Sequence, residues 1–188
     1  MGAACGAVSS FAEDHMHVQK LVVSDVPRYR ELMLHAYAAA PDAFTSTPEE
    51  RSAEPDSWWR KRIEDPDGKS LAFGAFHDDQ LIGSVTVEFS TKPKTRHKAK
   101  LIGMFVHASF RGLGAGAALV QAALQAARAR PEVRVVTLTV TEGNTSAVNL
   151  YLRLGFQTFG VEPMAIATPE GYKSKVHMWL PLNTPGAP

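Results

Sequence analysis

The sequence predicts a single α/β domain built on a mixed sheet in which most neighbouring strands run antiparallel. Its apolar patterns give seven strands and four helices, in the order strand, two helices, three strands, helix, strand, helix, two strands. Short turns join several consecutive strands, which builds antiparallel hairpins, whereas one long helix separates two strands near the middle, as a parallel crossover requires. A chain of 188 residues that is 45% apolar and 21% charged has the size and composition of one globular domain.

The first elements are a short strand and two helices. Residues 17–23 alternate and are rich in valine, which is typical of a strand. Ser24 is a candidate N-cap for a helix that extends to about residue 40. A loop rich in proline, serine, threonine and acids follows over 41–55, and a second, short helix is expected over 56–64.

The middle of the chain is predicted to form three antiparallel strands. Residues 70–76 and 81–89 are apolar runs on either side of an Asp-Asp turn, which indicates a β-hairpin. A basic turn over 91–97 leads into a third strand over 98–106. We interpret the basic turn as a solvated hairpin tip rather than a surface for nucleic acid.

The last part of the chain supplies the crossover and the closing strands. Residues 112–130 form a long helix rich in alanine and leucine, 133–140 a buried strand rich in valine, and 144–154 another helix. Two further strands over 156–161 and 175–182 complete a sheet of six to seven strands with helices on both faces.

Composition excludes several classes of protein. Cys5 is the only cysteine, which rules out an internal disulfide or a cysteine-based zinc cluster and fits a reducing compartment. No run approaches the roughly 20 apolar residues of a membrane helix, and no signal-peptide pattern opens the chain, so we expect a cytoplasmic protein without membrane contact. Residues 1–16 and 183–188 lack any period and are expected to be a flexible leader and tail around a domain over 17–182.

Charge is divided unevenly along the chain. Residues 1–94 hold 10 Lys and Arg against 15 Asp and Glu, a balance of −5, whereas residues 95–188 hold 10 against 4, a balance of +6. The acidic half could favour a cationic partner and the basic half an anionic one, although ordinary surfaces fluctuate by this much.

The clearest motif is the glycine-rich turn Arg-Gly-Leu-Gly-Ala-Gly-Ala over 111–117, between a strand and the long helix. Glycines let the backbone approach a ligand closely, and the free N–H groups at a helix start suit phosphate, as does Arg111. We therefore expect the turn to bind a pyrophosphate. A P-loop is excluded because no Lys and Ser or Thr follow Gly116. A dinucleotide fingerprint fits the glycine spacing but lacks its adjoining strand and its acid, and a helix entry without a ligand is the other alternative.

The pattern Arg-x-x-Gly-x-Gly over 111–116 resembles the coenzyme A signature of the GNAT superfamily of N-acetyltransferases. Residues 101–106 resemble the fourth strand of that family, and 140–156 resemble its fifth strand, the following helix with Asn and Tyr, and a Gly-Phe that starts the next strand. The similarity covers about 98–161, and the order of elements agrees with the family fold along the whole domain.

The resemblance implies a GNAT-type sheet, in which the fourth and fifth strands form a central splayed parallel pair, and acetyl-CoA as the acyl donor. The backbone of Met104, Phe105 and Val106 is implied to pair with the pantetheine arm in the gap between those strands. Asn144 is a candidate helix N-cap, to which the resemblance adds a contact with the same arm. The pyrophosphate is implied to bind the turn formed by Arg111, Gly112, Leu113, Gly114, Ala115, Gly116 and Ala117.

Tyr151 is the candidate general acid. It lies seven residues after Asn144 on the same helical face, with the small Ala147 between them. Spacing alone favours a tyrosine packed against the core with its hydroxyl in water, whereas the resemblance implies that it protonates the departing thiolate. A positioned acid of this kind contributes about 10²–10⁴-fold to a rate.

The general base stays open. The positions expected to face inward on the fourth strand, Lys100, Ile102 and Met104, include no carboxylate, although many relatives carry a Glu there. The remaining candidates, each of which also fits an ordinary exposed charge, are Glu50, Glu88 and His97.

The resemblance places the acceptor pocket among the first two helices, their loop and the last hairpin. Glu50 and Trp58 suit an ammonium group through charge and cation–π contact, although a tryptophan here also serves to anchor the short helix. Glu88 and Tyr172 are further candidates for contact with the acceptor.

These features predict an N-acetyltransferase that moves acetyl from acetyl-CoA to a primary amine of a small molecule, by direct attack in a ternary complex. No metal is expected, because the seven histidines show no ligand spacing. A protein N-terminal or lysine acetyltransferase and a non-catalytic CoA-binding sensor are the alternatives. A nucleic-acid partner is not expected, and a homodimer is an option by analogy alone.

Overall fold

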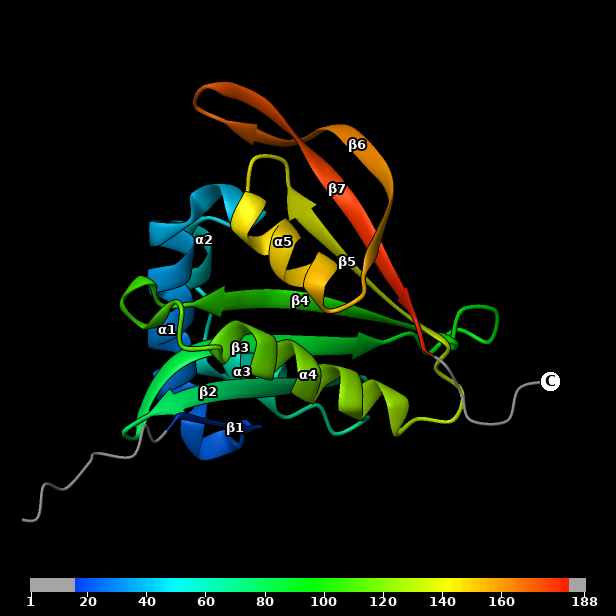
Figure 1. The fold of residues 1–188 in the computed structure, drawn as a ribbon. Coiled ribbons are helices and arrows are strands. Elements are labelled where there is room, and N and C mark those ends of the chain that lie inside the picture. The colour runs from blue at the N-terminus through cyan, green and yellow to red at the C-terminus, as the bar shows by residue number, and fades with distance from the viewer. Residues whose placement is uncertain (1–15, 183–188) are drawn as a thin grey trace, which may run out of the picture.

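The computed structural model describes residues 16–182, which form one seven-stranded sheet in the order β1-β2-β3-β4-β5-β7-β6 (Figure 1). Among these strands β4 and β5 pair in parallel and all other neighbours pair antiparallel, which confirms the predicted mixed sheet. The predicted leader and tail lie outside the described residues, apart from Met16, which opens β1. The strands are β1 (Met16–Lys20), β2 (Ser70–His77), β3 (Gln80–Phe89), β4 (Lys98–Val106), β5 (Val135–Thr141), β6 (Gln157–Thr168) and β7 (Gly171–Pro181). The helices are α1 (Val26–Ala39), α2 (Pro48–Ser52), α3 (Asp56–Ile63), α4 (Ala115–Arg128) and α5 (Thr145–Arg153).

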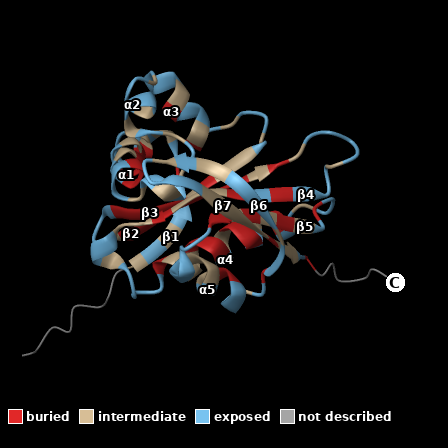
Figure 2. Cartoon of the chain, turned by 90° about the horizontal axis from the view of Figure 1, so that it is seen from above, coloured by how far each residue is buried: buried red, intermediate tan, exposed pale blue. Residues whose placement is uncertain are grey.

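Different helices cover the two faces of the sheet. Helices α4 and α5 contribute to one core and helices α1 and α3 to the other, where Trp59 is fully buried. Figure 2 shows that buried residues gather on the central strands and α4, whereas β6 and β7 are mostly exposed or intermediate. Helix α4 packs through a stripe of small and branched side chains at helical spacing: Leu119, Val120, Ala123, Leu124 and Ala127. No helix among residues 16–182 combines the length and apolar character that crossing a membrane requires.

The segment predicted as a loop over 41–55 contains a short helix, α2. Its start is fixed by a capping box: the Glu50 N–H donates to Thr47 Oγ1 at 3.2 Å, and the Thr47 N–H donates to Glu50 Oε2 at 2.8 Å. Pro48 occupies the first helical position, where its missing N–H costs nothing. The density of proline and polar residues therefore led to a loop being predicted where a short helix begins.

The last hairpin is longer than predicted. Strand β6 continues to Thr168 and β7 begins at Gly171, so the two strands are joined by a tight turn. The pairing register shifts after Glu162, where Pro163 and the left-handed Met164 (φ 53°) interrupt the alternation of side chains. A strand that resumes beyond such a bulge does not show as a continuous period-2 pattern.

A β-bulge at Gly103 reverses the alternation of side chains along β4. Gly103 has φ 62°, and the register between β3 and β4 shifts beside it. Before the bulge, Lys100 and Ile102 lie on the α1 side of the sheet, because Leu101 between them belongs to the core on the α4 side. After the bulge, Met104 packs against the core on the α4 side and Phe105 joins the core on the α1 side. The prediction that Lys100, Ile102 and Met104 share one inward face is therefore wrong, because the additional residue moves Met104 to the other side.

Candidate functional site

Strands β4 and β5 begin side by side and then diverge (Figure 1). Their parallel pairing is confined to residues 98–100 of β4 and 135–137 of β5. Beyond Lys100, β4 keeps its pairing with β3 and β5 keeps its pairing with β7. Among the described residues the facing edges of β4 and β5 therefore have no strand partner, and their backbone groups are available to an extended ligand.

The glycine turn lies where β4 ends and α4 begins. The helix starts at Ala115 rather than at residue 112, because Gly112 (φ 85°) and Gly114 (φ 82°) adopt left-handed conformations, with Gly114 as the N-cap. The Arg111 side chain is held at the end of β4, where its Nε–H donates to the Val106 carbonyl at 3.3 Å. The turn therefore combines the unpaired N–H groups of a helix start with a neighbouring guanidinium group, an arrangement that attracts phosphate.

Gly116 differs from Gly112 and Gly114 in that close packing, and not a left-handed backbone, marks its position. A Cβ atom at this position would lie 3.2 Å from Leu150 Cδ2 on α5 and 3.4 Å from Met104 Cε on β4. The first turn of α4 thus lies close to both α5 and the free stretch of β4. The structure places 104–106 beside the turn over 111–117, and this turn approaches α5 at Leu150, near the end of that helix rather than at Asn144.

Helix α5 carries Asn144 and Tyr151. Asn144 is the N-cap, as predicted, and its Oδ1 accepts a hydrogen bond from the Ala147 N–H at 3.2 Å, which leaves its amide NH₂ group for other contacts. Tyr151 is only 5% exposed and lies edge-on to Phe156, with ring centroids 5.7 Å apart. Burial raises the pKa of the Tyr151 phenol to about 12. Among residues 16–182 its hydroxyl has no hydrogen-bond partner.

The residues predicted to contact the acceptor are spread over several elements, unlike the glycine turn. Both carboxylate and N–H of Glu50 serve the capping box of α2. The guanidinium groups of Arg51 and Arg62 lie over the Trp58 ring, 4.5 and 4.4 Å from its centroid, so an ammonium group would compete with two cations for this ring. Tyr172 is 66% exposed near the tip of the β6–β7 hairpin.

The remaining candidate bases differ in position. Glu88 lies opposite Lys100 on the α1 side of the sheet, and its carboxylate is 4.0 Å from Arg62. His97 precedes β4 at the paired end, where its carbonyl accepts hydrogen bonds from the backbone of Arg134 and Val135. It therefore lies at the far end of β4 from the glycine turn.

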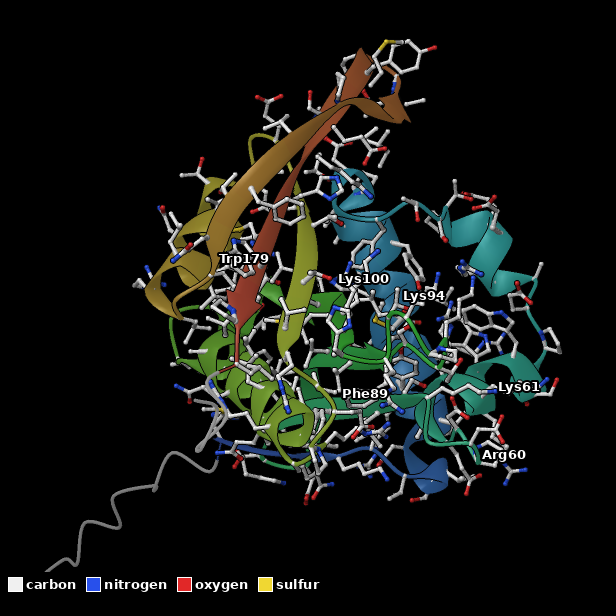
Figure 3. The ribbon with its side chains drawn as sticks, turned by 90° about the vertical axis from the view of Figure 1, so that its right-hand side faces the viewer. Arg60, Lys61, Phe89, Lys94, Lys100 and Trp179 are labelled. Atoms are coloured by element: carbon white, nitrogen blue, oxygen red, sulfur yellow. The ribbon has the colours of Figure 1, made fainter. Side chains whose placement is uncertain are left out.

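Sequence reasoning missed a polar group on the α1 side of β5 and β7. His177 Nε2 and Glu162 Oε2 are 3.0 Å apart across the last hairpin, and Lys175 lies two residues before His177 on the same face. Burial and the charge of Lys100 lower the pKa of Lys175. In Figure 3 Lys100 lies beside β5 on the side toward α1. Glu162 reaches His177 diagonally, since the ladder places Gly160 opposite His177 and Glu162 opposite Lys175, and no sequence period reveals this contact.

Two surface pockets, of about 370 and 410 Å³, lie elsewhere. The first lies between α1 and the β2–β3 turn, and the second between the end of β1 and α3. Neither is lined by a residue that the sequence assigned to the donor site. The divergence of β4 and β5 differs from both pockets, because it combines free backbone edges with a glycine turn at a helix start.

Comparison with known proteins agrees with this geometry. Over 106 residues the chain is 27% identical to the L-amino acid N-acetyltransferase AaaT of Escherichia coli (strain K12), a match that covers 56% of this chain and 64% of that protein. A GCN5-related N-acetyltransferase from Kribbella flavida superposes with a TM-score of 0.74 at 28% identity, covering 89% of this chain and 98% of that one. YncA, a putative acetyltransferase from Salmonella typhimurium solved with its cofactor acetyl-CoA, superposes with a TM-score of 0.75 at 18% identity, covering 93% and 98%. The sequence model of the acetyltransferase (GNAT) family matches residues 26–156, most of the chain, and the protein therefore belongs to the GNAT family of acetyltransferases.

Proposed function

We propose that the protein transfers an acetyl group from acetyl-CoA to the primary amine of a small molecule, by direct attack within a ternary complex. The observation that carries this proposal is the free edge of β4, which leads directly into the glycine turn at the start of α4. Membership of the GNAT family and the acetyl-CoA bound by the Salmonella neighbour support the choice of donor.

The residues on the donor side fit a nucleotide thioester. An extended arm would pair with the backbone of Met104, Phe105 and Val106, because this stretch has no strand beside it toward β5. The pyrophosphate would lie on the helix start beside Arg111, where a Cβ atom added at Gly112 or Gly114 meets nothing within 4 Å. The free amide NH₂ group of Asn144 is a further donor toward the arm. When bound, acetyl-CoA supplies the activated acyl group.

We assign the role of general acid to Tyr151. A departing thiolate needs a proton, and the Tyr151 phenol carries one throughout the physiological range. Because burial raises its pKa to about 12 and so makes it a weaker acid, it can donate only to a sulfur held close to it. Tyr151 belongs to the same core as Met104 and Val106, on the face that α4 and α5 cover. The proton that the leaving thiolate needs is therefore held on the face of the sheet that α4 and α5 cover.

We assign the role of general base to His177, oriented by Glu162. The amine must lose a proton, and β4 offers no carboxylate for that step. His177 lies opposite Thr139 in the ladder, two residues beyond the last pairing of β4 with β5, and the Glu162 carboxylate fixes its ring at 3.0 Å. Its face is the one that carries α1, opposite the face with Tyr151.

A small-molecule acceptor is favoured by the name of the Escherichia coli relative, an L-amino acid N-acetyltransferase. The alternatives from the sequence, a protein acetyltransferase and a CoA-binding sensor, predict different results in the assay below. The homodimer stays a prediction that size-exclusion chromatography with light scattering will decide.

The first experiment is a thermal unfolding scan with acetyl-CoA, CoA and NADH added separately. A ligand at 100 times its dissociation constant stabilises a protein by about 2.7 kcal/mol, and acetyl-CoA and CoA should each raise the midpoint by several degrees while NADH does not. Release of CoA is then followed with a panel of amines. Tyr151→Phe should lower turnover at least tenfold with CoA affinity retained. A midpoint shift with NADH alone, or turnover unchanged by Tyr151→Phe, contradicts the assignment.

A further inference from the structure

Two lysines from different strands lie on the face where we place the acceptor. Lys100 pairs with Thr137 of β5 at the point where β4 and β5 separate, and Lys175 pairs with Thr141 further along β5. Four residues of strand separate these two register positions, roughly 13 Å along β5 at 3.3 Å per residue. Lysine stems are long and flexible, so both ammonium groups can approach one small ligand between them.

Register and packing place the two lysines on the same side of the sheet. Their neighbours along the strands, Leu101 and Val176, belong to the core on the α4 side, and side chains alternate along a strand. The charge of Lys100 contributes to the lowered pKa of Lys175, which agrees with this placement. His177 lies between the two lysine positions in the ladder, opposite Thr139.

Neither lysine has a carboxylate within 4 Å among the described residues, because the nearby acids have other partners. Glu88 lies opposite Lys100, but its carboxylate is 4.0 Å from Arg62. Glu162 lies opposite Lys175 and offsets part of its charge, but its carboxylate contacts His177. Asp42, at the α1 side of β5, pairs with Lys173. Two neighbouring cations with no ion-pair partner repel each other, and an anion between them removes that repulsion.

We propose that Lys100 and Lys175 bind an anionic group of the acceptor, so that the amine which the protein acetylates carries a carboxylate or a similar anion close to its nitrogen. This inference rests on the proposed function and specifies its substrate class. It also departs from the expectation that Glu50 and Trp58 receive an ammonium group, because Glu50 caps α2 and two guanidinium groups already lie over the Trp58 ring. An acceptor with a second positive charge is repelled from this face.

The test compares acceptors that differ only in the anion. Release of CoA is measured for a panel of L-amino acids and for the corresponding L-amino acid amides, which keep the amine and side chain but lack the carboxylate. We expect kcat/KM to favour the acids at least tenfold. Lys100→Met and Lys175→Met should each lower that preference at least fivefold, through a higher KM for the acid, while kcat/KM for the amide changes less than twofold.

Lys61→Met is the matched control, because it removes one positive charge from the exposed surface of α3, away from β5 and β7 (Figure 3). It should leave the preference unchanged. Circular dichroism and the thermal midpoint show whether each variant is folded, and methionine preserves most of the lysine stem.

The outcomes separate the inference from the function on which it rests. Equal rates for acids and amides, or a preference for acids that survives both substitutions, overturn the lysine subsite while acetyl transfer stands. Calorimetric titration of the same amino acids in the presence of CoA provides a readout that needs no turnover. Binding of the acid that is lost in Lys100→Met and Lys175→Met supports the subsite even if no acetyl transfer is seen, and absence of such binding overturns it.

Discussion

Burial of the Tyr151 phenol makes the stability of the protein depend on alkaline pH. The folded chain raises the pKa of this group from an ordinary value of about 10 to about 12, so the unfolded chain loses the phenolic proton first. Below pH 10 both states keep the proton and the full stability is present; as the pH rises from 10 to 12 the unfolded state is favoured progressively. Each pKa unit corresponds to about 1.4 kcal/mol, so Tyr151 removes about 1.4 kcal/mol at pH 11 and somewhat less than 3 kcal/mol at pH 12.

The measurement is urea unfolding of the wild type and Tyr151→Phe at pH 8 and pH 11. Phenylalanine keeps the ring that packs on Phe156 and removes only the ionisable hydroxyl. We expect the wild type to lose about 1.4 kcal/mol more than the variant between the two pH values. Tyr29, whose pKa burial also raises to about 12, contributes equally to both proteins and cancels in the comparison. An identical loss in both proteins would refute the argument that Tyr151 is held protonated by its buried environment.

Two further substitutions separate structural from chemical roles. Gly114→Ala forces a residue with a Cβ atom into a left-handed conformation (φ 82°), so the free energy of unfolding should fall by about 1–2 kcal/mol. The same substitution should weaken the binding of acetyl-CoA. Urea unfolding and calorimetry measure the two effects, and unchanged values would contradict the role given to the turn. Glu50→Gln keeps the capping box of α2 and should retain stability and turnover, whereas Glu50→Ala should lose about 1 kcal/mol, measured as a midpoint lowered by about 2–4 °C, with turnover retained. A large loss of turnover in Glu50→Gln would instead indicate that the Glu50 carboxylate takes part in the reaction.

The local conformation of the glycine turn and of the start of α5 was predictable from the sequence, because it depends on residues that are neighbours in the chain. The glycines at 112 and 114 are needed where the backbone is left-handed, and Asn144 caps the helix that it precedes. Helix α4 begins at Ala115 rather than at residue 112, since the two left-handed glycines delay it, and it ends at Arg128 rather than at residue 130. The capping box of α2 was equally local and was visible as Thr-x-x-Glu, but the proline-rich surroundings led to a loop being predicted.

The proposed acceptor side was not predictable, because it depends on the register of strand pairing. One additional residue at Gly103 decides which side chains of β4 face α1, and the shift after Glu162 places that residue opposite Lys175 and diagonal to His177. Neither shift changes the composition or the apolar content of its strand, so neither alters the signal from which strands are predicted. The tyrosine and the histidine lie 26 positions apart in the sequence, and only the sheet shows that they lie on opposite faces.

The proposed reaction needs a base and an acid at two different atoms. The amine nitrogen must lose a proton as it adds to the carbonyl carbon of the thioester, and the sulfur must gain one when the tetrahedral intermediate collapses and the carbon–sulfur bond breaks. With Tyr151 on the α5 side and His177 on the α1 side, the divergence of β4 and β5 is the place where both groups could serve one acyl carbon. Because a regular β4 would turn Met104 toward the acceptor and away from the donor arm, the bulge at Gly103 is part of this arrangement. In the proposed mechanism the acceptor and the donor therefore meet where β4 and β5 no longer pair.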